Sequence, residues 1–177
     1  HEKKLVRFYY EDKEDMFDGF SYNKGGQVLH MLRKVVGDDA FFASLKNYLE
    51  TNKYKTAEVH QLRLAFEEVS GEDLNWFFDQ WFLSKGHAII HTNQTIDMES
   101  NTVTLHIMQK QITPNFPVFR IPVKIAIWDA NGKRTEKIII DSLAQSFTFK
   151  INGELQNMLF DEDQMLLGKY YEDKPIN

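Results

Sequence analysis

Histidine and glutamate are the residues of this chain that could bind a catalytic metal, and there are six histidines. The motif H-E-x-x-H places two histidines one helical turn apart, with the glutamate as a general base. The chain begins H-E-K-K, but Leu5 stands where the second histidine would be, so the motif is incomplete. His87 and His91 have the same spacing without the glutamate, and Ile89 and Ile90 between them favour a strand. Because residues four apart share one face of a strand, a weak surface metal site remains an alternative for this pair.

Other catalytic groups are either missing or lack a recognisable pattern. The chain has no cysteine, which excludes disulfides, thiol catalysis and cysteine-ligated metals. It contains no G-x-S-x-G nucleophile motif and no glycine-rich phosphate loop. His30 and His60 fall within helical stretches and are interpreted as structural. Neighbouring carboxylates are expected at helix starts and on solvated faces: Glu11-Asp12, Glu14-Asp15, Asp38-Asp39, Glu67-Glu68 and Asp161-Glu162-Asp163.

Helices are expected up to about residue 87, because apolar residues recur there at spacings of three and four. The predicted helices run from about Tyr22 to Gly37, from Asp38 or Asp39 onward, from after Thr56 to Gly71, and from Leu74 to Gly86. The carboxylate of Asp38 or Asp39 and the hydroxyl of Thr56 are expected to cap first-turn amides. Short connections predict that neighbouring helices pack antiparallel in a compact bundle.

Gly25 and Gly26 lie inside the first of these helices, where each glycine is about 1 kcal/mol less favourable than alanine. Such a loss is typical of a position that another backbone or side chain approaches closely. We therefore expect a close local contact near the start of this helix.

Strands are expected after residue 87, where apolar and polar residues alternate. Val103, Leu105 and Ile107 are predicted to face inward from a strand at residues 102–108. Further strands are expected at residues 121–129, 138–141, 146–151 and 158–161. Asn131 and Gly132 are predicted to form a tight hairpin turn, because both accept positive φ. This spacing predicts a small antiparallel β-sandwich, and the polar residues 169–177 are expected to fray.

Length and composition limit the class of protein. The 177 residues suffice for one full domain or two small ones, and a hydrophobic content of 42% excludes a disordered chain. Acidic side chains outnumber basic ones by 26 to 21, so no nucleic-acid-binding surface is expected. No apolar run approaches 18 residues, so no membrane span is expected. These properties leave both the cytoplasm and the periplasm open as locations, and they leave the oligomeric state open.

An ordered series of short motifs covers residues 20–90. It consists of S-Y-N-K-G-G-Q-V-L-H-M-L at 21–32, G-D-D-A-F-F at 37–42, S-G-E-D-L at 70–74, F-F-D-Q-W at 77–81 and G-H at 86–87. The series resembles the gluzincin zinc aminopeptidases, the family of the alanyl and membrane aminopeptidases, in which Y-x-K-G starts a helix. Gln111, Phe116-Pro117 and residues 121–123 are similar to the small β-sandwich that follows the catalytic domain in this family. The resemblance implies a parent enzyme that uses zinc to hydrolyse the N-terminal bond of a peptide substrate.

The resemblance also assigns a catalytic role to Tyr22. In the family, the matching tyrosine donates a hydrogen bond to the oxyanion that forms when zinc-bound water attacks the peptide carbonyl. The chemistry suits a phenol, because its usual pKa near 10 keeps it protonated at neutral pH and a donor aimed at developing charge stabilises the transition state. Lys24 is interpreted as structural, and so are Asp79, Gln80 and Trp81.

The chain departs from the family in what lies before Tyr22. The zinc ligands, the general-base glutamate and the G-x-M-E-N loop of the family lie upstream of the tyrosine, and none is present here; Ala88 also replaces a proline that is frequent after G-H. We expect an α+β fold, with residues 1–87 as the helical C-terminal part of a thermolysin-like catalytic domain and residues 88–177 as a β-sandwich domain. This chain alone is expected to bind no catalytic zinc and to be inactive. The alternative is a non-catalytic binding module whose exposed aromatic residues, Tyr170, Tyr171 and Trp128, recognise a protein or a glycan.

Overall fold

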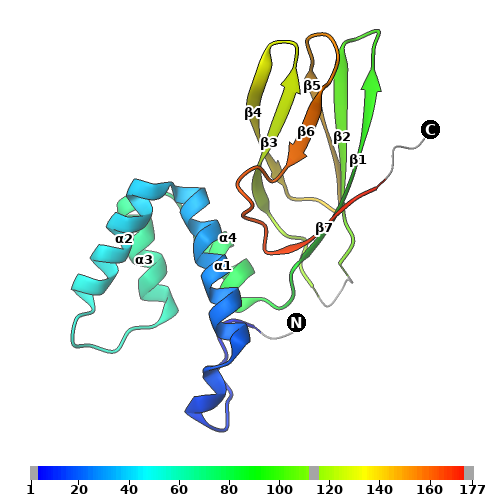
Figure 1. Cartoon of the computed structure of the whole chain (residues 1–177). Helices are drawn as coiled ribbons and strands as arrows, with labels where there is room; N and C mark the ends of the chain where they lie inside the picture. Colours follow the sequence, from blue (N-terminus) through cyan, green and yellow to red (C-terminus); the bar gives the residue numbers. More distant parts are fainter. Residues whose placement is uncertain (1–3, 112–115, 174–177) are drawn as a thin grey trace. The chain divides into compact units, whose positions relative to one another are not determined.

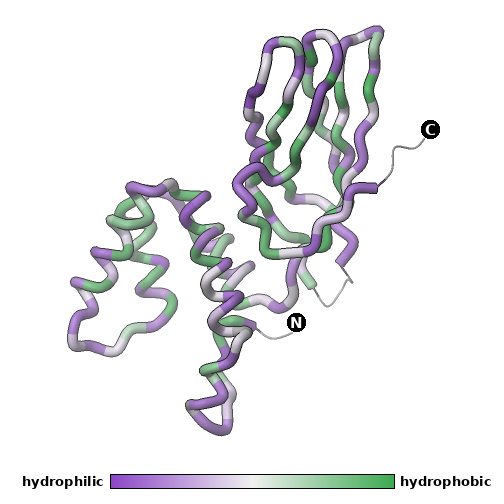
Figure 2. Tube along the Cα trace, in the orientation of Figure 1, coloured by the Kyte–Doolittle hydropathy of each residue, from purple (hydrophilic) through white to green (hydrophobic). Residues whose placement is uncertain are grey.

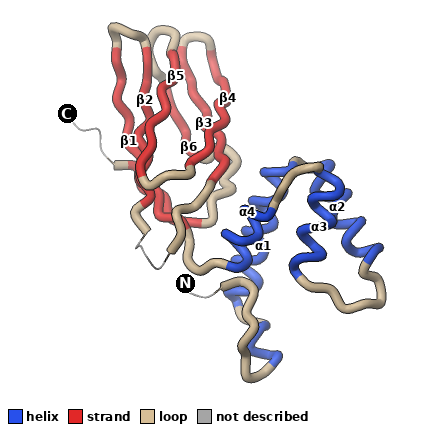
Figure 3. Tube along the Cα trace, turned by 180° about the vertical axis from the view of Figure 1, so that it is seen from behind, coloured by secondary structure: helices blue, strands red, loops and turns tan. Residues whose placement is uncertain are grey.

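The computed structural model describes residues 4–111 and 116–173. The chain divides into two compact units, His1–Gly86 and His87–Asn177 (Figure 1). In the part of the chain that the structure describes, the helices lie in the first unit and the strands in the second (Figure 3). The fold is therefore α+β, a helical part followed by a small β-sandwich, as the sequence predicted. Over these same ranges, none of the helices combines the length and apolar character that crossing a membrane requires.

From residue 4 onward, the helical unit contains four α-helices and two short turns of other helix types. A 3₁₀ turn, Lys13–Met16, precedes α1, Gly19–Val36; α2, Asp38–Thr51, α3, Val59–Ser70, and α4, Asn75–Phe78, follow. Helix α4 continues directly into a π-helical turn, Asp79–Leu83, whereas the sequence predicted one regular helix up to Gly86. Helix α1 begins before Tyr22, which therefore lies within its first turns.

Helix α2 begins at Asp38 as predicted, but the capping of α2 and α3 differs from the expected pattern. No side chain caps α2: the Asp38 carboxylate instead accepts from Arg33 Nε at 2.8 Å and Nη2 at 2.6 Å. Helix α3 begins after Glu58 rather than after Thr56, and the Glu58 N–H donates to Gln61 Oε1 at 2.5 Å. Both expectations about capping residues were therefore wrong.

The core of the helical unit is aromatic and aliphatic. Val28 and Leu32 of α1 are fully buried, and so is Phe66 of α3. The Phe41 ring of α2 meets the Phe66 ring edge-on, with centroids 5.5 Å apart. The π-helical turn adds Trp81, which is also buried. These contacts join helices that are separate in sequence, so the short connections predicted a bundle correctly.

The second unit consists of two packed sheets. Its strands are β1, Ala88–Asp97, β2, Thr102–Gln109, β3, Ile121–Asp129, β4, Gly132–Ile140, β5, Ala144–Lys150, β6, Asn157–Phe160, and β7, Gly168–Glu172. One sheet has the order β5-β2-β1-β7 and the other the order β4-β3-β6 (Figure 1). Val103, Leu105 and Ile107 are buried as predicted, and Figure 2 shows hydrophobic and hydrophilic residues alternating along the strands.

The expectation that residues 169–177 fray is wrong for the residues up to 173, which the structure describes, because they include strand β7. It pairs in parallel with β1, from Ala88 opposite Gly168 to Thr92 opposite Glu172. Gly168 is required for this pairing, because a Cβ there would lie 2.4 Å from the Ala88 carbonyl oxygen. The sandwich is thus antiparallel except at this edge.

The hairpin between β3 and β4 turns one residue earlier than predicted. Asp129 pairs with Gly132, so Ala130 and Asn131 form the turn. Gly132 has a φ of 90°, whereas Asn131 does not have a positive φ. A glycine that follows the turn in this conformation is typical of hairpins closed by a type I turn and a bulge.

Candidate functional site

Tyr22 lies near the start of α1, where its backbone N–H donates to the Asp18 carbonyl at 3.2 Å. Asp18 is the N-cap residue of the helix, and its Oδ1 accepts from the Ser21 N–H at 2.7 Å. The Tyr22 side chain is 65% exposed. The helix start therefore presents the phenol to its surroundings rather than packing it into the core of the helical unit, as a residue that meets a substrate requires.

One arginine clamps this helix start. Arg7 Nη1 donates to Asp18 Oδ2 at 3.0 Å, and Arg7 Nη2 donates to Ser21 Oγ at 2.8 Å. The hydrogen bond from the Ser21 backbone, followed by the Arg7 guanidinium, holds the pKa of Asp18 well below its usual range. Sequence analysis missed both Arg7 and Asp18. An aspartate three residues before a serine is an N-cap signal that identifies Asp18, whereas Arg7 has no local signal.

The residues that follow Tyr22 in the Y-x-K-G motif are a buried lysine and two glycines. Lys24 is buried, and burial lowers the pKa of its ammonium group. The predicted close approach to the glycines is wrong for Gly26, where an added Cβ would meet nothing within 4 Å. At Gly25 it would meet only the Leu5 side chain, at 3.8 Å, which is an ordinary contact. Neither glycine is therefore required by packing.

The histidines that the structure describes lie in separate environments. Among residues 4–111 and 116–173, no group of three or more histidine, aspartate or glutamate side chains could hold a metal ion, so the described residues do not fit a zinc site. His91 Nδ1 lies 3.0 Å from Asp173 Oδ1, and its ring stacks on Tyr171. His106 lies between the hydroxyls of Thr95 and Ser146, at 3.0 and 2.9 Å. The incomplete motif at the first residues lies mostly outside the described part of the chain.

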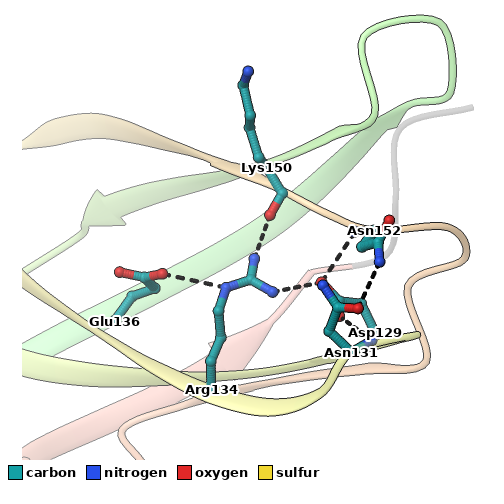
Figure 4. Close-up of polar contacts among 6 residues, drawn as sticks. All are labelled: Asp129, Asn131, Arg134, Glu136, Lys150 and Asn152. Atoms are coloured by element: carbon teal, nitrogen blue, oxygen red, sulfur yellow. Dashed lines mark hydrogen bonds and ion pairs between the residues drawn. The ribbon is translucent and has the colours of Figure 1, made fainter.

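A buried carboxylate in the sandwich has a structural role. Asp129 is only 2% exposed and accepts from the backbone N–H groups of Asn131 at 2.9 Å and Asn152 at 3.1 Å (Figure 4). Arg134 Nη1 donates to it at 2.5 Å, while Nη2 of the same arginine donates to the Lys150 carbonyl. The backbone bonds, followed by the arginine, lower the pKa of Asp129. Because its partners are all structural, the cluster ties the β3–β4 hairpin to the end of β5 and leaves no group for a substrate.

The aromatic residues of the alternative binding module are in contact with other side chains of the sandwich. Tyr170 stacks on Phe160 with ring centroids 4.8 Å apart, and its hydroxyl lies 3.0 Å from Thr92 Oγ1. Trp128 has Lys133 Nζ 5.4 Å from its ring centroid. Tyr170 and Tyr171 are nevertheless 42% and 45% exposed.

Comparison with known proteins shows what the chain is similar to. Residues 5–81 match the model of the peptidase family M1 domain. The chain is 26% identical over 154 residues to a probable aminopeptidase 1 of Sulfurisphaera tokodaii, covering 87% of this chain and 16% of that protein. It is 36% identical over 90 residues to aminopeptidase N of Lactococcus lactis subsp. lactis, covering 51% of this chain and 10% of that protein.

A solved structure shares the fold. The crystal structure of Legionella pneumophila aminopeptidase A in complex with aspartic acid matches 97% of this chain with a TM-score of 0.81 and 15% sequence identity. The chain spans 20% of that structure, as it spans only 16% and 10% of the two relatives above. The matched family segment contains Tyr22 and the whole Y-x-K-G motif. The match over residues 5–81 confirms that this segment resembles the zinc aminopeptidases of the M1 peptidase family.

Proposed function

We propose that this chain is part of a zinc-dependent aminopeptidase, in which Tyr22 stabilises the oxyanion. In this proposal, residues 1–87 are the helical C-terminal part of the catalytic domain, and residues 88–177 are the β-sandwich domain that follows it. The substrate is a peptide whose N-terminal bond is hydrolysed. The observation that carries the proposal is that Tyr22, inside the segment of the M1 match, has an exposed phenol at a clamped helix start.

The chemistry follows from what one phenol can do. When water attacks the scissile carbonyl, negative charge develops on the carbonyl oxygen. A phenol O–H at hydrogen-bond distance from that oxygen stabilises the transition state more than the substrate, and such a donor raises kcat. The proposal includes the expectation that the chain alone neither binds catalytic zinc nor cleaves peptides, because the family's zinc ligands lie upstream of the tyrosine.

The test of the site is Tyr22→Phe in the longer peptidase that carries this segment. Removing one oxyanion donor should lower kcat by roughly 10²-fold, with a much smaller change in KM. A variant with undiminished kcat would remove Tyr22 from the mechanism.

A second test asks whether the chain by itself binds zinc or hydrolyses a substrate. Purified chain should contain no stoichiometric zinc by metal analysis and should not hydrolyse aminoacyl-anilides. Stoichiometric zinc together with turnover would refute this part of the proposal.

The alternative, a non-catalytic binding module, is separated from the peptidase by the coding sequence upstream of His1. An H-E-x-x-H motif followed by a further glutamate there supports the peptidase. The absence of that motif from the upstream sequence supports a binding module or a degenerate relative.

A further inference from the structure

The segment that contains Arg7 is attached to two parts of the helical unit. The Val6 N–H donates to the Phe82 carbonyl, in the π-helical turn, at 3.0 Å. The Leu5 side chain lies beside Gly25 of α1, where an added Cβ would be 3.8 Å from it. Residues 5–7 therefore form a strap, the name used below for this segment, between the π-helical turn and the first turns of α1.

Arg7 connects this strap to the residues that set the backbone of Tyr22. Its two terminal nitrogens reach Asp18, whose carbonyl accepts from the Tyr22 N–H, and Ser21, which immediately precedes Tyr22. The guanidinium reaches the two acceptors with N–H groups on two separate nitrogens in a fixed plane, whereas an ammonium group has its donors on a single nitrogen at the end of a flexible stem. The Arg7 side chain is only 15% exposed, so water competes weakly for these bonds.

The Arg7 guanidinium does not have a hydrogen-bond partner for every one of its nitrogen atoms. Arg7 Nε is buried and has no hydrogen-bond partner within the described ranges. The side chain therefore leaves the Nε donor unsatisfied, while one N–H on each terminal nitrogen fixes the helix start. Because the Tyr22 phenol is mostly exposed, packing around its ring restrains it little, and the first turn of the helix, which sets the direction of the Tyr22 Cα–Cβ bond, is the main restraint that the described residues supply.

We propose that Arg7 is a positioning residue for Tyr22, acting through Asp18 and Ser21. The proposal rests on the function proposed for Tyr22 above. A reacting group displaced by about 1 Å loses roughly 10²-fold in rate, so a clamp on the helix start has a direct effect on catalysis. Arg7 itself touches no reacting atom in this account.

The first experiment measures the clamp in the chain as it exists, by amide hydrogen exchange with NMR. Arg7→Gln should accelerate exchange at Ser21 and Tyr22 by roughly tenfold, as expected for losing charge-assisted hydrogen bonds, while the interior of α1 stays protected. Arg7→Lys keeps the charge but not the fork, so it should show the same pattern to a smaller degree. Asp18→Asn keeps a capping oxygen but loses the ion pair, and it should resemble Arg7→Gln.

The matched control is Arg33→Gln, which breaks a two-bond arginine–aspartate pair at the other end of the same helix. This variant should leave exchange at Ser21 and Tyr22 unchanged. Unchanged exchange in both Arg7 variants would overturn the proposal. Equal acceleration throughout α1 and α3 would do the same, because it would mean that Arg7 only stabilises the unit as a whole.

The second experiment measures catalysis in the longer peptidase. Arg7→Gln should lower kcat at least tenfold with KM and zinc content unchanged, and Arg33→Gln should leave all three unchanged. If Tyr22→Phe lowers kcat but Arg7→Gln does not, the positioning role fails. If Tyr22→Phe has no effect on kcat, the proposed function fails, and the exchange measurement still decides whether the clamp exists.

Discussion

A buried pair of glutamine side chains offers a sharp test of what holds the sandwich together. Gln109, which is 4% exposed, donates from Nε2 to the Phe119 carbonyl at 2.7 Å and accepts the Phe119 N–H at 2.9 Å. Its Oε1 also accepts from Gln111 Nε2 at 2.8 Å, and Gln111 donates in turn to the Pro117 carbonyl at 2.9 Å. The two amides therefore hydrogen-bond to the backbone of Pro117 and Phe119, just before β3.

Gln109→Met keeps the length of the side chain and removes these bonds. Two buried backbone groups, the N–H and the carbonyl of Phe119, each lose the partner that Gln109 provided. A buried polar group left without its partner costs about 1–3 kcal/mol. The greater apolarity of methionine offsets roughly 1 kcal/mol of the total. The expected loss is about 3 kcal/mol, a large fraction of the stability typical of a unit of this size.

The assay is urea unfolding followed by the NMR amide signals of β2 and β3, which report on the sandwich alone. With a slope of about 1.5 kcal/mol per molar, the midpoint should fall by roughly 2 M. The matched control is Gln156→Met, the same chemical change at an exposed position, which should alter stability by less than about 0.5 kcal/mol. A loss below about 1 kcal/mol for Gln109→Met would refute the argument that the Phe119 backbone depends on this amide.

Three further changes test other contacts. Because the folded pKa of Asp129 is lowered, the stability that its carboxylate contributes is present above its unfolded pKa of about 3.9 and is lost as the pH falls toward the folded pKa. Acid unfolding of the wild type should therefore begin below about pH 4, and the dependence of stability on pH should be shallower in Asp129→Asn. Identical pH profiles of the two proteins would contradict this prediction. Gly168→Ala should detach β7 and expose the β1 amides to hydrogen exchange, since its Cβ would lie 2.4 Å from the Ala88 oxygen; retained protection would show that β7 can shift instead. Gly26→Ala meets open space inside α1 and should raise the stability of the helical unit by up to about 1 kcal/mol in thermal unfolding, whereas a loss would reveal a contact that the structure lacks.

The periodic parts of the fold could be predicted from the sequence, because burial follows the repeat of each element. Val28 and Leu32 of α1 and Leu105 of β2 are buried where the spacing places them. The ends of elements could not be predicted in the same way. Asp38 was a good candidate cap for α2, but Arg33, one turn back, provides a two-bond partner that a first-turn amide cannot match.

Contacts between residues distant in sequence were also beyond prediction. Nothing in residues 168–172 alone indicates a parallel partner, because that pairing depends on β1 forming a sheet edge and on the absence of a side chain at Gly168. Tyr22 could be identified from its motif. Arg7 could not, since it lies 11 residues from Asp18 and 14 from Ser21, and only the folded strap brings the three together.

The exposure of Tyr22 constrains how it can work. In bulk water, a phenol that donates to an oxyanion replaces a hydrogen bond from water, so the net gain is small. The same bond stabilises a developing charge strongly only where water is excluded and the donor is already in place. The Arg7–Asp18–Ser21 clamp helps to hold the donor in place. The residues described here do not exclude water from Tyr22, which is 65% exposed. A catalytic role for Tyr22 therefore requires that another protein surface or the substrate itself cover the phenol. For this reason, the kcat of the longer peptidase decides the assignment, and no property of the isolated chain can do so.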